Sequence, residues 1–318
     1  MNIRKILSLA LITVLSLGFT KAQAQAVANC VSGNNRTLVV STDPSLGAPF
    51  TFIDPATGRP TGSDIATICA VAQLLGVNIE LRALPFAQGL AGVAAGTIDV
   101  HISTITITRA RLQQLAFVKY SDEALGMLFR GSVPAGVTIE NALQPGSPLA
   151  GRTIAVITNS VHVGMVESIG ATALQFPSAE QLGAAVESGA ADAALSDLGL
   201  VATVATGNRV ILQPVTPPPG TELLGLGIAI NPRCCQLYVN IQAAINQLNA
   251  NGTLAVIRNR FGVVPNTFTP SNLTPAECAS FTPALVSRNC ISQFIFNKYC
   301  PQGPNTLCNF TFVPGTGA

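Results

Sequence analysis

Three hydroxyl side chains and one arginine follow a short apolar segment in the first third of the chain. Alternating apolar residues predict a buried strand early in the stretch from Asp99 to Arg111. Ser103, Thr104 and Thr106 place hydroxyls where that strand ends, and Arg111 begins a predicted helix. A guanidinium can hold a carboxylate through two parallel hydrogen bonds, which the point charge of lysine cannot do. The stretch therefore predicts a site for a small anionic group.

The same arrangement occurs a second time downstream. Each copy has an alanine-rich helical segment, a glycine, an aspartate three residues later, a strand and then polar residues: Gly96, Asp99 and Ser103-Thr104 in the first, Gly189, Asp192 and Ser196-Asp197 in the second. Either glycine can take the left-handed conformation that ends a helix. Because open α/β sheets bind ligands beyond the carboxyl ends of their strands, we expect Arg111 and Asp197 to face one crevice. A cation and an anion there suit a zwitterion.

The first 26 residues predict a secretory signal. Basic residues precede an apolar run from Ile6 to Phe19, and small residues allow cleavage near Ala24 or Ala26. The run is too short to span a bilayer, which needs about 20 apolar residues. A lipid anchor on Cys30 is not expected, because Asn29 precedes it where such a cysteine would follow Gly or Ala. We therefore expect an exported protein located in the periplasm.

Charge and length limit the function further. The chain has 318 residues, enough for two lobes with separate cores, with 17 basic and 15 acidic side chains. Loss of the signal removes Arg4, Lys5 and Lys21, which leaves the mature protein nearly neutral. Nucleic acids and anionic membranes call for a basic face, so neither is an expected partner.

Several motifs resemble the periplasmic polar amino-acid-binding proteins of ABC transporters, solute-binding protein family 3. The resemblance covers about residues 37 to 263 and rests on five segments. These are Thr42-Asp-Pro through Pro49-Phe50, Gly62-Ser-Asp64, Leu75-Gly-Val77, the stretch from Ser103 to Arg111, which is similar to the family's SxTxTxxR signature, and Asn251 to Gly262.

The resemblance implies an α/β fold of the type II periplasmic-binding class, a clamshell of two lobes. Two crossover hinge strands, near Glu123 to Phe129 and Thr221 to Gly227, would join the lobes and let them close on a ligand. Lobe 1 would comprise residues 27–125 and 222–263, and lobe 2 residues 126–221. Residues 264–318 would form a cysteine-rich extension outside the resemblance.

The resemblance also implies roles for single residues. Arg111 and the Ser160–Val161 turn would hold an α-carboxylate, and Asp197 an α-amino group. Thr104 and Thr106 would bond the same groups from lobe 1. The side-chain end of the ligand would lie against three residues: Phe86, Asp43 and Leu46.

The turn after the strand that ends at Ile157 departs from the family's usual GTT. Asn159 replaces its glycine and Val161 a hydroxyl residue, so only the backbone of Val161 carries over. We expect His162, the next residue, to be an exposed helix residue rather than a ligand contact. No metal and no cofactor are expected.

Eight cysteines in an exported chain predict disulfides. Four of them, Cys278, Cys290, Cys300 and Cys308, lie in the extension and predict two disulfides there with three possible connectivities. A zinc site is the alternative, but the extension has no C-x-x-C spacing and no histidine. At least one of the adjacent Cys234 and Cys235 should pair elsewhere. Every disulfide should belong to lobe 1 or the extension.

These features together predict a monomeric binding protein that captures a free amino acid and delivers it to an ABC transporter permease, without enzymatic activity. Two alternatives remain. A periplasmic dehydratase acting on prephenate-like acids would use Asp43 or Asp197 as its acid or base. A docking or sensor protein with a degenerate pocket would explain Ser63 in place of the family's Phe and Glu123-Ala-Leu125 in place of its Pro-Tyr-Tyr.

Overall fold

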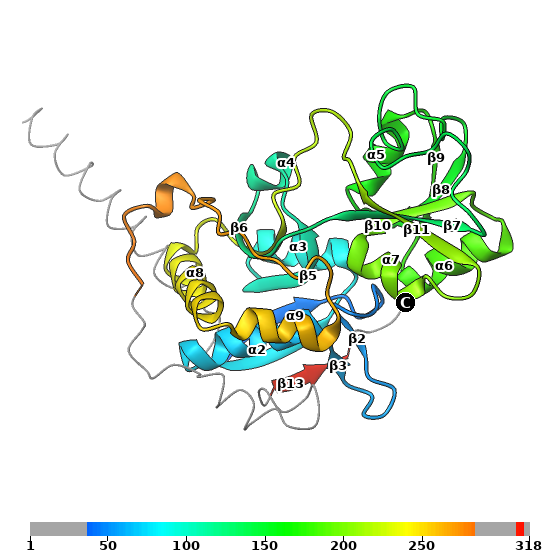
Figure 1. The fold of residues 1–318 in the computed structure, drawn as a ribbon. Coiled ribbons are helices and arrows are strands. Elements are labelled where there is room, and N and C mark those ends of the chain that lie inside the picture. Colours follow the sequence, from blue (N-terminus) through cyan, green and yellow to red (C-terminus); the bar gives the residue numbers. More distant parts are fainter. Residues whose placement is uncertain (1–36, 284–309, 315–318) are drawn as a thin grey trace, which may run out of the picture.

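The computed structural model describes residues 37–283 and 310–314. The predicted signal sequence and Cys30, Cys290, Cys300 and Cys308 lie outside these ranges. The described chain forms two α/β units, each built on its own sheet (Figure 1). We call them lobe 1 and lobe 2. Within the described ranges, no helix has both the length and the apolar character that a membrane crossing requires.

Lobe 1 contains a six-stranded mixed sheet in the order β13-β4-β1-β5-β12-β6. β1 pairs in parallel with β4 and β5, whereas β12 runs antiparallel to β5 and β6. The strands are β1 (Thr37–Thr42), β4 (Asn78–Ala83), β5 (Val100–Thr106), β6 (Ala116–Ser121), β12 (Leu226–Ile230) and β13 (Phe310–Val313). A small hairpin of β2 (Phe52–Ile53) and β3 (Pro60–Thr61) lies beside the sheet.

Helices cover both faces of this sheet because its strands are apolar on both sides. Leu38 and Val40 pack into the core under three helices, whereas Val39 packs into the core under one helix on the opposite face. The first group comprises α2 (Ser63–Leu75), α8 (Cys235–Ala250) and α9 (Thr253–Phe261); the opposite helix is α3 (Phe86–Ala95). The one-turn helix α4 (Arg109–Leu112) follows β5.

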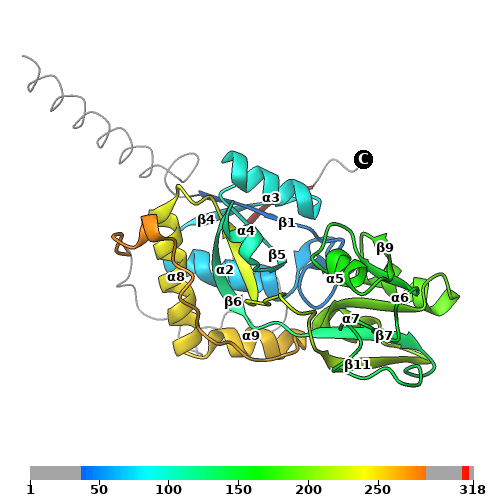
Figure 2. The same cartoon turned by 90° about the horizontal axis from the view of Figure 1, so that it is seen from above.

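Lobe 2 contains a five-stranded sheet in the order β11-β7-β10-β8-β9. Its strands are β7 (Leu125–Arg130), β8 (Thr153–Ile157), β9 (Thr172–Phe176), β10 (Ala193–Asp197) and β11 (Arg209–Val215). Its helices are α5 (His162–Ser168), α6 (Ala179–Ser188) and α7 (Leu198–Val204). The chain enters lobe 2 through residues 122–124 and returns through residues 216–225, so two connections join the lobes (Figure 2).

The two-copy pattern of the sequence corresponds to two matching pieces of structure. Gly96 and Gly189 end α3 and α6 in the left-handed conformation, each with φ 77°. The aspartate that follows each glycine makes the same kind of contact. Asp99 accepts a hydrogen bond from Val39 N, and Asp192 accepts one from Thr153 N, both at 2.8 Å. Each carboxylate thus ties a helix-to-strand turn to the neighbouring parallel strand.

Asp64, in the first turn of α2, links that helix to the lobe 1 sheet. α2 begins at Ser63 after Gly62, and Asp64 makes no cap hydrogen bond. Its carboxylate points under the sheet end instead and accepts hydrogen bonds from Thr104 N at 2.9 Å and Tyr120 Oη at 2.7 Å. This buried carboxylate therefore connects α2 with β5 and β6.

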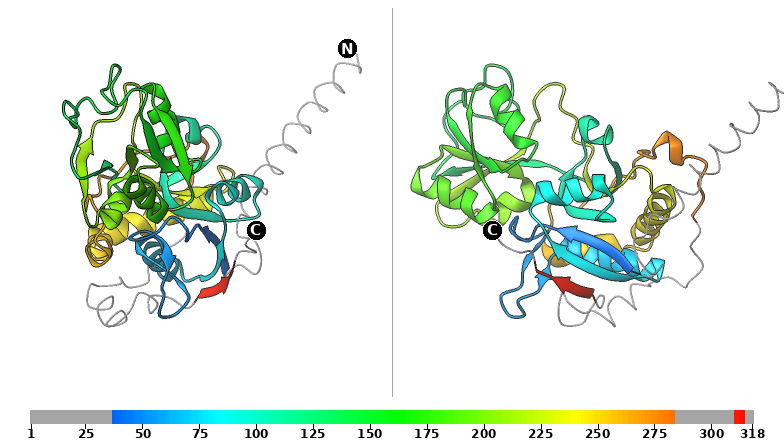
Figure 3. Two further views of the ribbon diagram at one scale, coloured as in Figure 1. Left: turned by 90° about the vertical axis from the view of Figure 1, so that its right-hand side faces the viewer. Right: turned by 180° about the vertical axis from the view of Figure 1, so that it is seen from behind.

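The C-terminal extension adds a strand that the sequence did not indicate. β13 pairs in parallel with β4 at the edge of the lobe 1 sheet (Figure 3). Arg59 donates to Phe310 O at 3.0 Å, and its guanidinium lies 4.7 Å from the centre of the Phe310 ring. The extension thereby covers an otherwise exposed sheet edge.

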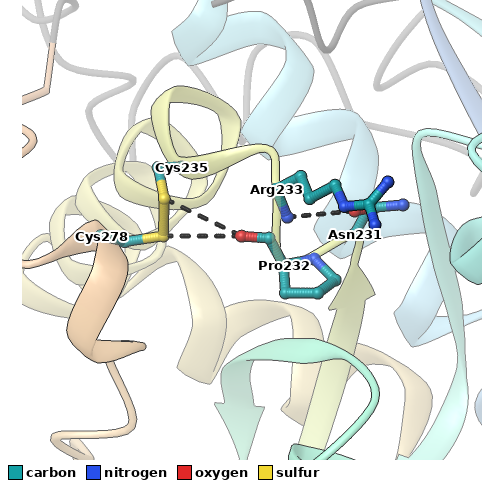
Figure 4. Close-up of a disulfide and its surroundings, with 5 residues drawn as sticks. All are labelled: Asn231, Pro232, Arg233, Cys235 and Cys278. Atoms are coloured by element: carbon teal, nitrogen blue, oxygen red, sulfur yellow. Dashed lines mark hydrogen bonds between the residues drawn. A yellow bond between two sulfur atoms is a disulfide. The ribbon is translucent and has the colours of Figure 1, made fainter. Parts of the chain in front are cut away.

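The expectation that the extension would bond its four cysteines to one another is wrong for Cys278. The short 3₁₀ helix η1 (Ala276–Cys278) packs against α8, which brings the Cα atoms of Cys235 and Cys278 within 5.0 Å, and the two form a disulfide (Figure 4). Both sulfurs lie 3.9 Å from Pro232 O. Cys69 and Cys234 are disulfide-bonded as well. Within the described residues, the four bonded cysteines belong to lobe 1 or the extension.

Replacing both Cys235 and Cys278 by alanine should lower the free energy of unfolding by about 2–4 kcal/mol, because the bond closes a long loop in the unfolded chain. Urea unfolding of the oxidised protein measures this. Since both thiols are removed together, neither partner of this bond is left free to mispair. An unchanged midpoint would contradict the structural role of this bond.

A second stability prediction concerns Gly89, which lies in α3 directly over the ring of His101. An added Cβ would stand 2.4 Å from that ring, and the ring cannot retreat because its Nδ1 lies 2.9 Å from Ser41 Oγ. Gly89→Ala should therefore destabilise the protein by about 1–3 kcal/mol. Gly164→Ala is the matched control, since nothing lies within 4 Å of its added Cβ. A thermal melt in which both variants behave alike would contradict this packing.

Candidate ligand-binding site

A cavity between the lobes collects polar side chains from both. Its volume is about 20 Å³, and it adjoins a cavity of about 490 Å³ that shares Leu46, Phe86 and Ile157 with it. The walls of the smaller cavity come from lobe 1 (Leu46, Phe86, Thr104, Thr106 and Arg111) and from lobe 2 (Ile157, Ser160, Val161, His162, Asp197 and Leu200). We call this cavity the cleft.

The lobes also touch directly beside the cleft. Ala179 N donates to Leu46 O at 3.1 Å, and Thr203 Oγ1 donates to Ala48 O at 3.1 Å. Phe50 of lobe 1 lies so close to Gly199 that an added Cβ there would stand 2.7 Å from its ring. These contacts hold the loop after β1 against α6 and α7, so the structure shows the lobes in a closed arrangement.

Arg111 is held rigidly on the lobe 1 side. Thr108 caps α4 by accepting a hydrogen bond from Arg111 N at 3.2 Å, and Arg111 Nη1 donates to Thr106 O at 2.7 Å. The guanidinium also lies 5.4 Å from the centre of the Phe86 ring. Burial lowers the pKa of Arg111, while the carboxyls of Glu123 and Asp197 act in the opposite direction. A guanidinium remains charged in proteins, so the cleft contains one fixed cation.

Two carboxyls face that cation. Asp197 ends β10 and precedes α7, yet its side chain makes no cap hydrogen bond, and its buried Oδ1 has no partner. Glu123 comes from the first connection between the lobes; its Oε1 accepts from Thr106 Oγ1 at 2.8 Å, and its buried Oε2 has no partner. Burial and the nearby Asp197 raise the pKa of Glu123 well above its usual range.

His162 corrects an expectation from the sequence. It was expected to be exposed, but as the first residue of α5 it points into the cleft and is only 2% exposed. Neither ring nitrogen has a hydrogen-bond partner, and burial lowers the pKa of the imidazole. Ser160 Oγ, two residues before it, is likewise buried and unpartnered.

A second row of polar groups supports the lobe 1 wall. Thr104 has a left-handed backbone, with φ 47°, that its bond to Asp64 stabilises. Burial raises the pKa of Asp64 to about 6. Ser103 faces away from the cleft, and its Oγ accepts a hydrogen bond from Asp43 N at 3.0 Å. In the hydroxyl-rich stretch, Thr104 and Thr106 therefore line the cleft, whereas Ser103 holds the loop after β1.

The structure brings together eight of the nine residues proposed from the sequence; Asp43 stands apart. Its carboxylate accepts from Phe86 N at 2.8 Å and from Ser45 N at 3.0 Å, and it lines the adjoining cavity. Sequence reasoning missed Ile157, His162 and Leu200, which line the cleft, and Glu123, which lies beside His162 and Asp197. Only Glu123 carried a signal, since it departs from the residue that the resembling family has there.

Two α/β lobes joined by two connections, with a polar cleft between them, define a two-lobed binding protein of the type II periplasmic-binding fold. Residues 38–264 match the bacterial extracellular solute-binding proteins, family 3, and the chain belongs to this family. The family expected from the sequence is thereby confirmed.

Two similar proteins come from the bacteria Chlamydia trachomatis and Haemophilus influenzae. The chain is 22% identical over 237 residues to the probable ABC transporter arginine-binding protein ArtJ of Chlamydia trachomatis, covering 72% of this chain and 87% of that protein. It is 27% identical over 188 residues to a probable amino-acid ABC transporter-binding protein of Haemophilus influenzae, covering 59% and 70%.

Solved structures share the fold. An ancestral arginine-binding protein bound to arginine has a TM-score of 0.61 at 24% identity, over 72% of this chain and 99% of that one. An arginine-specific periplasmic binding protein of Salmonella typhimurium has a TM-score of 0.59 at 20% identity, over 72% and 100%. AncCDT-1, described as an ancestral amino acid-binding protein and a precursor of cyclohexadienyl dehydratase, has a TM-score of 0.60 at 24% identity, over 71% and 94%.

The chain has two histidines, and both are held neutral by burial, so neither should titrate near pH 6.5. The pKa of His101 falls to about 4 and that of His162 falls below its ordinary value. In the unfolded chain both bind protons below about pH 6.5. The histidines therefore contribute a loss of stability as pH falls from about 6.5 to about 4.

Nitrogen-15 NMR of the two imidazoles across this pH range measures their midpoints. The urea-unfolded chain is the control and should show two ordinary titrations. A midpoint near 6.5 for His162 in the folded protein would contradict its burial in the cleft.

Proposed function

We propose that this protein binds a free α-amino acid in the cleft and presents it to an ABC transporter permease. One observation carries the proposal: buried polar atoms without partners converge on the cleft beside a fixed cation. Ser160 Oγ, Asp197 Oδ1 and both ring nitrogens of His162 belong to residues that line the cleft, and Glu123 Oε2 belongs to a residue beside Asp197 and His162. Buried polar groups are normally hydrogen-bonded, and leaving one unpaired costs about 1–3 kcal/mol. A small polar ligand would satisfy several at once.

The charges in the cleft suit the two ends of an amino acid. Arg111 is the cation, and its planar fork can bind a carboxylate, with Ser160 Oγ as a further donor from lobe 2. Asp197 supplies an anion for the α-ammonium group. Because Arg111 belongs to lobe 1 and Asp197 to lobe 2, a ligand that contacts both would stabilise the closed arrangement of the lobes.

The side chain of the ligand would extend past Phe86 and Leu46. Both residues line the cleft and the adjoining cavity, which therefore offers the direction in which a side chain could continue. Asp43 takes part indirectly, because its carboxylate fixes the backbone at Phe86. Thr104 and Thr106 would complete the polar wall, with the Thr106 hydroxyl already engaged to Glu123.

Family membership and the named relatives support a transport role outside the cytoplasm. The family consists of extracellular solute-binding proteins, and both bacterial relatives are named as binding proteins of ABC transporters. We infer that the chain is exported through its first 26 residues and acts in the periplasm as a monomer without enzymatic activity. AncCDT-1, whose description mentions a dehydratase, is itself described as amino acid-binding.

Arg111→Ala should weaken amino-acid binding by about 2–5 kcal/mol, at least about thirtyfold, because a ligand carboxylate would lose its charged partner. Isothermal titration calorimetry tests this against the common amino acids. The protein is first unfolded and refolded with its disulfides intact, so that bound ligand is removed.

Arg109→Ala is the matched control for this experiment. Arg109 lies in the same helical turn, but its side chain is 74% exposed and pairs with Glu222 outside the cleft. Its removal should leave binding unchanged. A folded wild-type protein that binds none of the amino acids would refute the proposed function, and turnover of prephenate followed by ultraviolet absorbance would then support a dehydratase.

A further inference from the structure

Three acceptor groups meet at one point of the cleft, and two of them were absent from the expected site. Glu123, His162 and Asp197 each present an atom there, and these three atoms all lie within 4.8 Å of one another. Each side chain has a buried nitrogen or oxygen without a hydrogen-bond partner. They come from three places in the fold: the first connection between the lobes, the start of α5 and the end of β10.

The number and type of these groups specify what can bind. A primary ammonium group has three N–H donors and a positive charge, so it can bond all three acceptors at once. A secondary ammonium group has only two donors, and a hydroxyl has one. Two carboxyls at this separation also repel each other when both are ionised, and a cation between them removes that repulsion.

We propose that Glu123 is a further ligand-binding residue, and that Glu123, Asp197 and His162 together form a subsite for the primary ammonium group of the ligand. This subsite rests on the proposed function and extends it: the ligand class becomes amino acids with an unsubstituted amino group. Amino acids with a secondary amine, such as proline and N-methyl derivatives, are excluded.

Without a ligand, the carboxyls of Glu123 and Asp197 still lie close together in the free protein. Burial and the nearby Asp197 raise the pKa of Glu123 well above its usual range, so a proton on Glu123 relieves the repulsion between the two carboxyls in the free protein. Arg111 from α4 and neutral His162 from α5 face the pair, and Asp64 and Tyr120 stand behind it under the lobe 1 sheet. The ammonium group takes the place of the proton on Glu123, so that binding releases a proton to solvent.

Proton release makes affinity depend on pH in a defined direction. Where Glu123 is protonated in the free protein, the dissociation constant should rise as pH falls, by up to about tenfold per pH unit, because proton and ligand compete. Above the pKa of Glu123 the affinity should become independent of pH. Both trends can be measured on the wild-type protein alone.

Calorimetric titration of the tightest-binding amino acid, in buffers of different ionisation enthalpy at pH 6, gives the number of protons released. The same titration is repeated with the N-methyl derivative of that amino acid. We expect proton release close to one and at least about tenfold weaker binding of the derivative. No release together with equal affinity for the derivative would overturn the proposal.

Glu123→Gln tests the residue itself, with Glu222→Gln as the control for loss of an exposed carboxylate that pairs with Arg109. Glu123→Gln should bind at least about tenfold more weakly at pH 8 and show a flattened pH dependence, whereas the control should match wild type. Glu123→Asp keeps the charge and should restore the pH dependence if the glutamine variant folds poorly.

Two outcomes separate this proposal from the proposed function. If wild type binds an amino acid but Glu123→Gln has the same affinity and pH dependence, the subsite is wrong and the proposed function stands. If Zn²⁺ binds wild type tightly without amino acid and that binding is lost in Glu123→Gln, the three groups form a metal site and the ammonium subsite is overturned.

Discussion

A guanidinium charge removed from water between two lobes is the constraint on which the rest of the structure depends. Desolvation of Arg111 disfavours its charge, and the carboxyls of Glu123, in the first connection between the lobes, and of Asp197, in lobe 2, compensate. A buried charge is costly unless it is paired. The lobes therefore have to position acids accurately against one cation, and the polar atoms that remain unpartnered mark where a ligand completes the arrangement.

The duplicated half-unit explains how the fold achieves that positioning. In each lobe a helix ends at a left-handed glycine, and an aspartate ties the turn to the neighbouring parallel strand. The strand that follows the aspartate carries polar residues to the cleft. β5 thus delivers Thr104 and Thr106, and β10 delivers Asp197. The tertiary constraints around Thr104 add to this: Asp64 holds its left-handed backbone in place from α2.

Much of this could be predicted from the sequence because it depends on local signals. Gly96 and Gly189 end their helices through their own backbone conformation, which does not depend on distant parts of the chain. Eight of the nine proposed site residues line one cleft because strand ends converge in α/β sheets. His162 was misjudged because its exposure depends on lobe 1, which covers the start of α5. Glu123 was missed because a residue between two strands has no periodicity to indicate its direction.

The structure of the C-terminal extension was even harder to predict from the sequence. β13 has a place only because the edge of β4 offers one, and Cys278 bonds Cys235 because η1 packs on α8. Nothing within residues 264–318 specifies either partner. Local sequence thus determines the elements of this protein, whereas the closed cleft and the attached extension follow from packing between distant segments.

A crystal structure of the protein with the amino acid that binds most tightly in calorimetry tests the central claim most directly. The account predicts the ligand carboxylate within hydrogen-bond distance of the Arg111 guanidinium, and the ligand nitrogen in contact with Asp197 and Glu123. A ligand seated elsewhere, or one whose carboxylate lies away from Arg111, would contradict it.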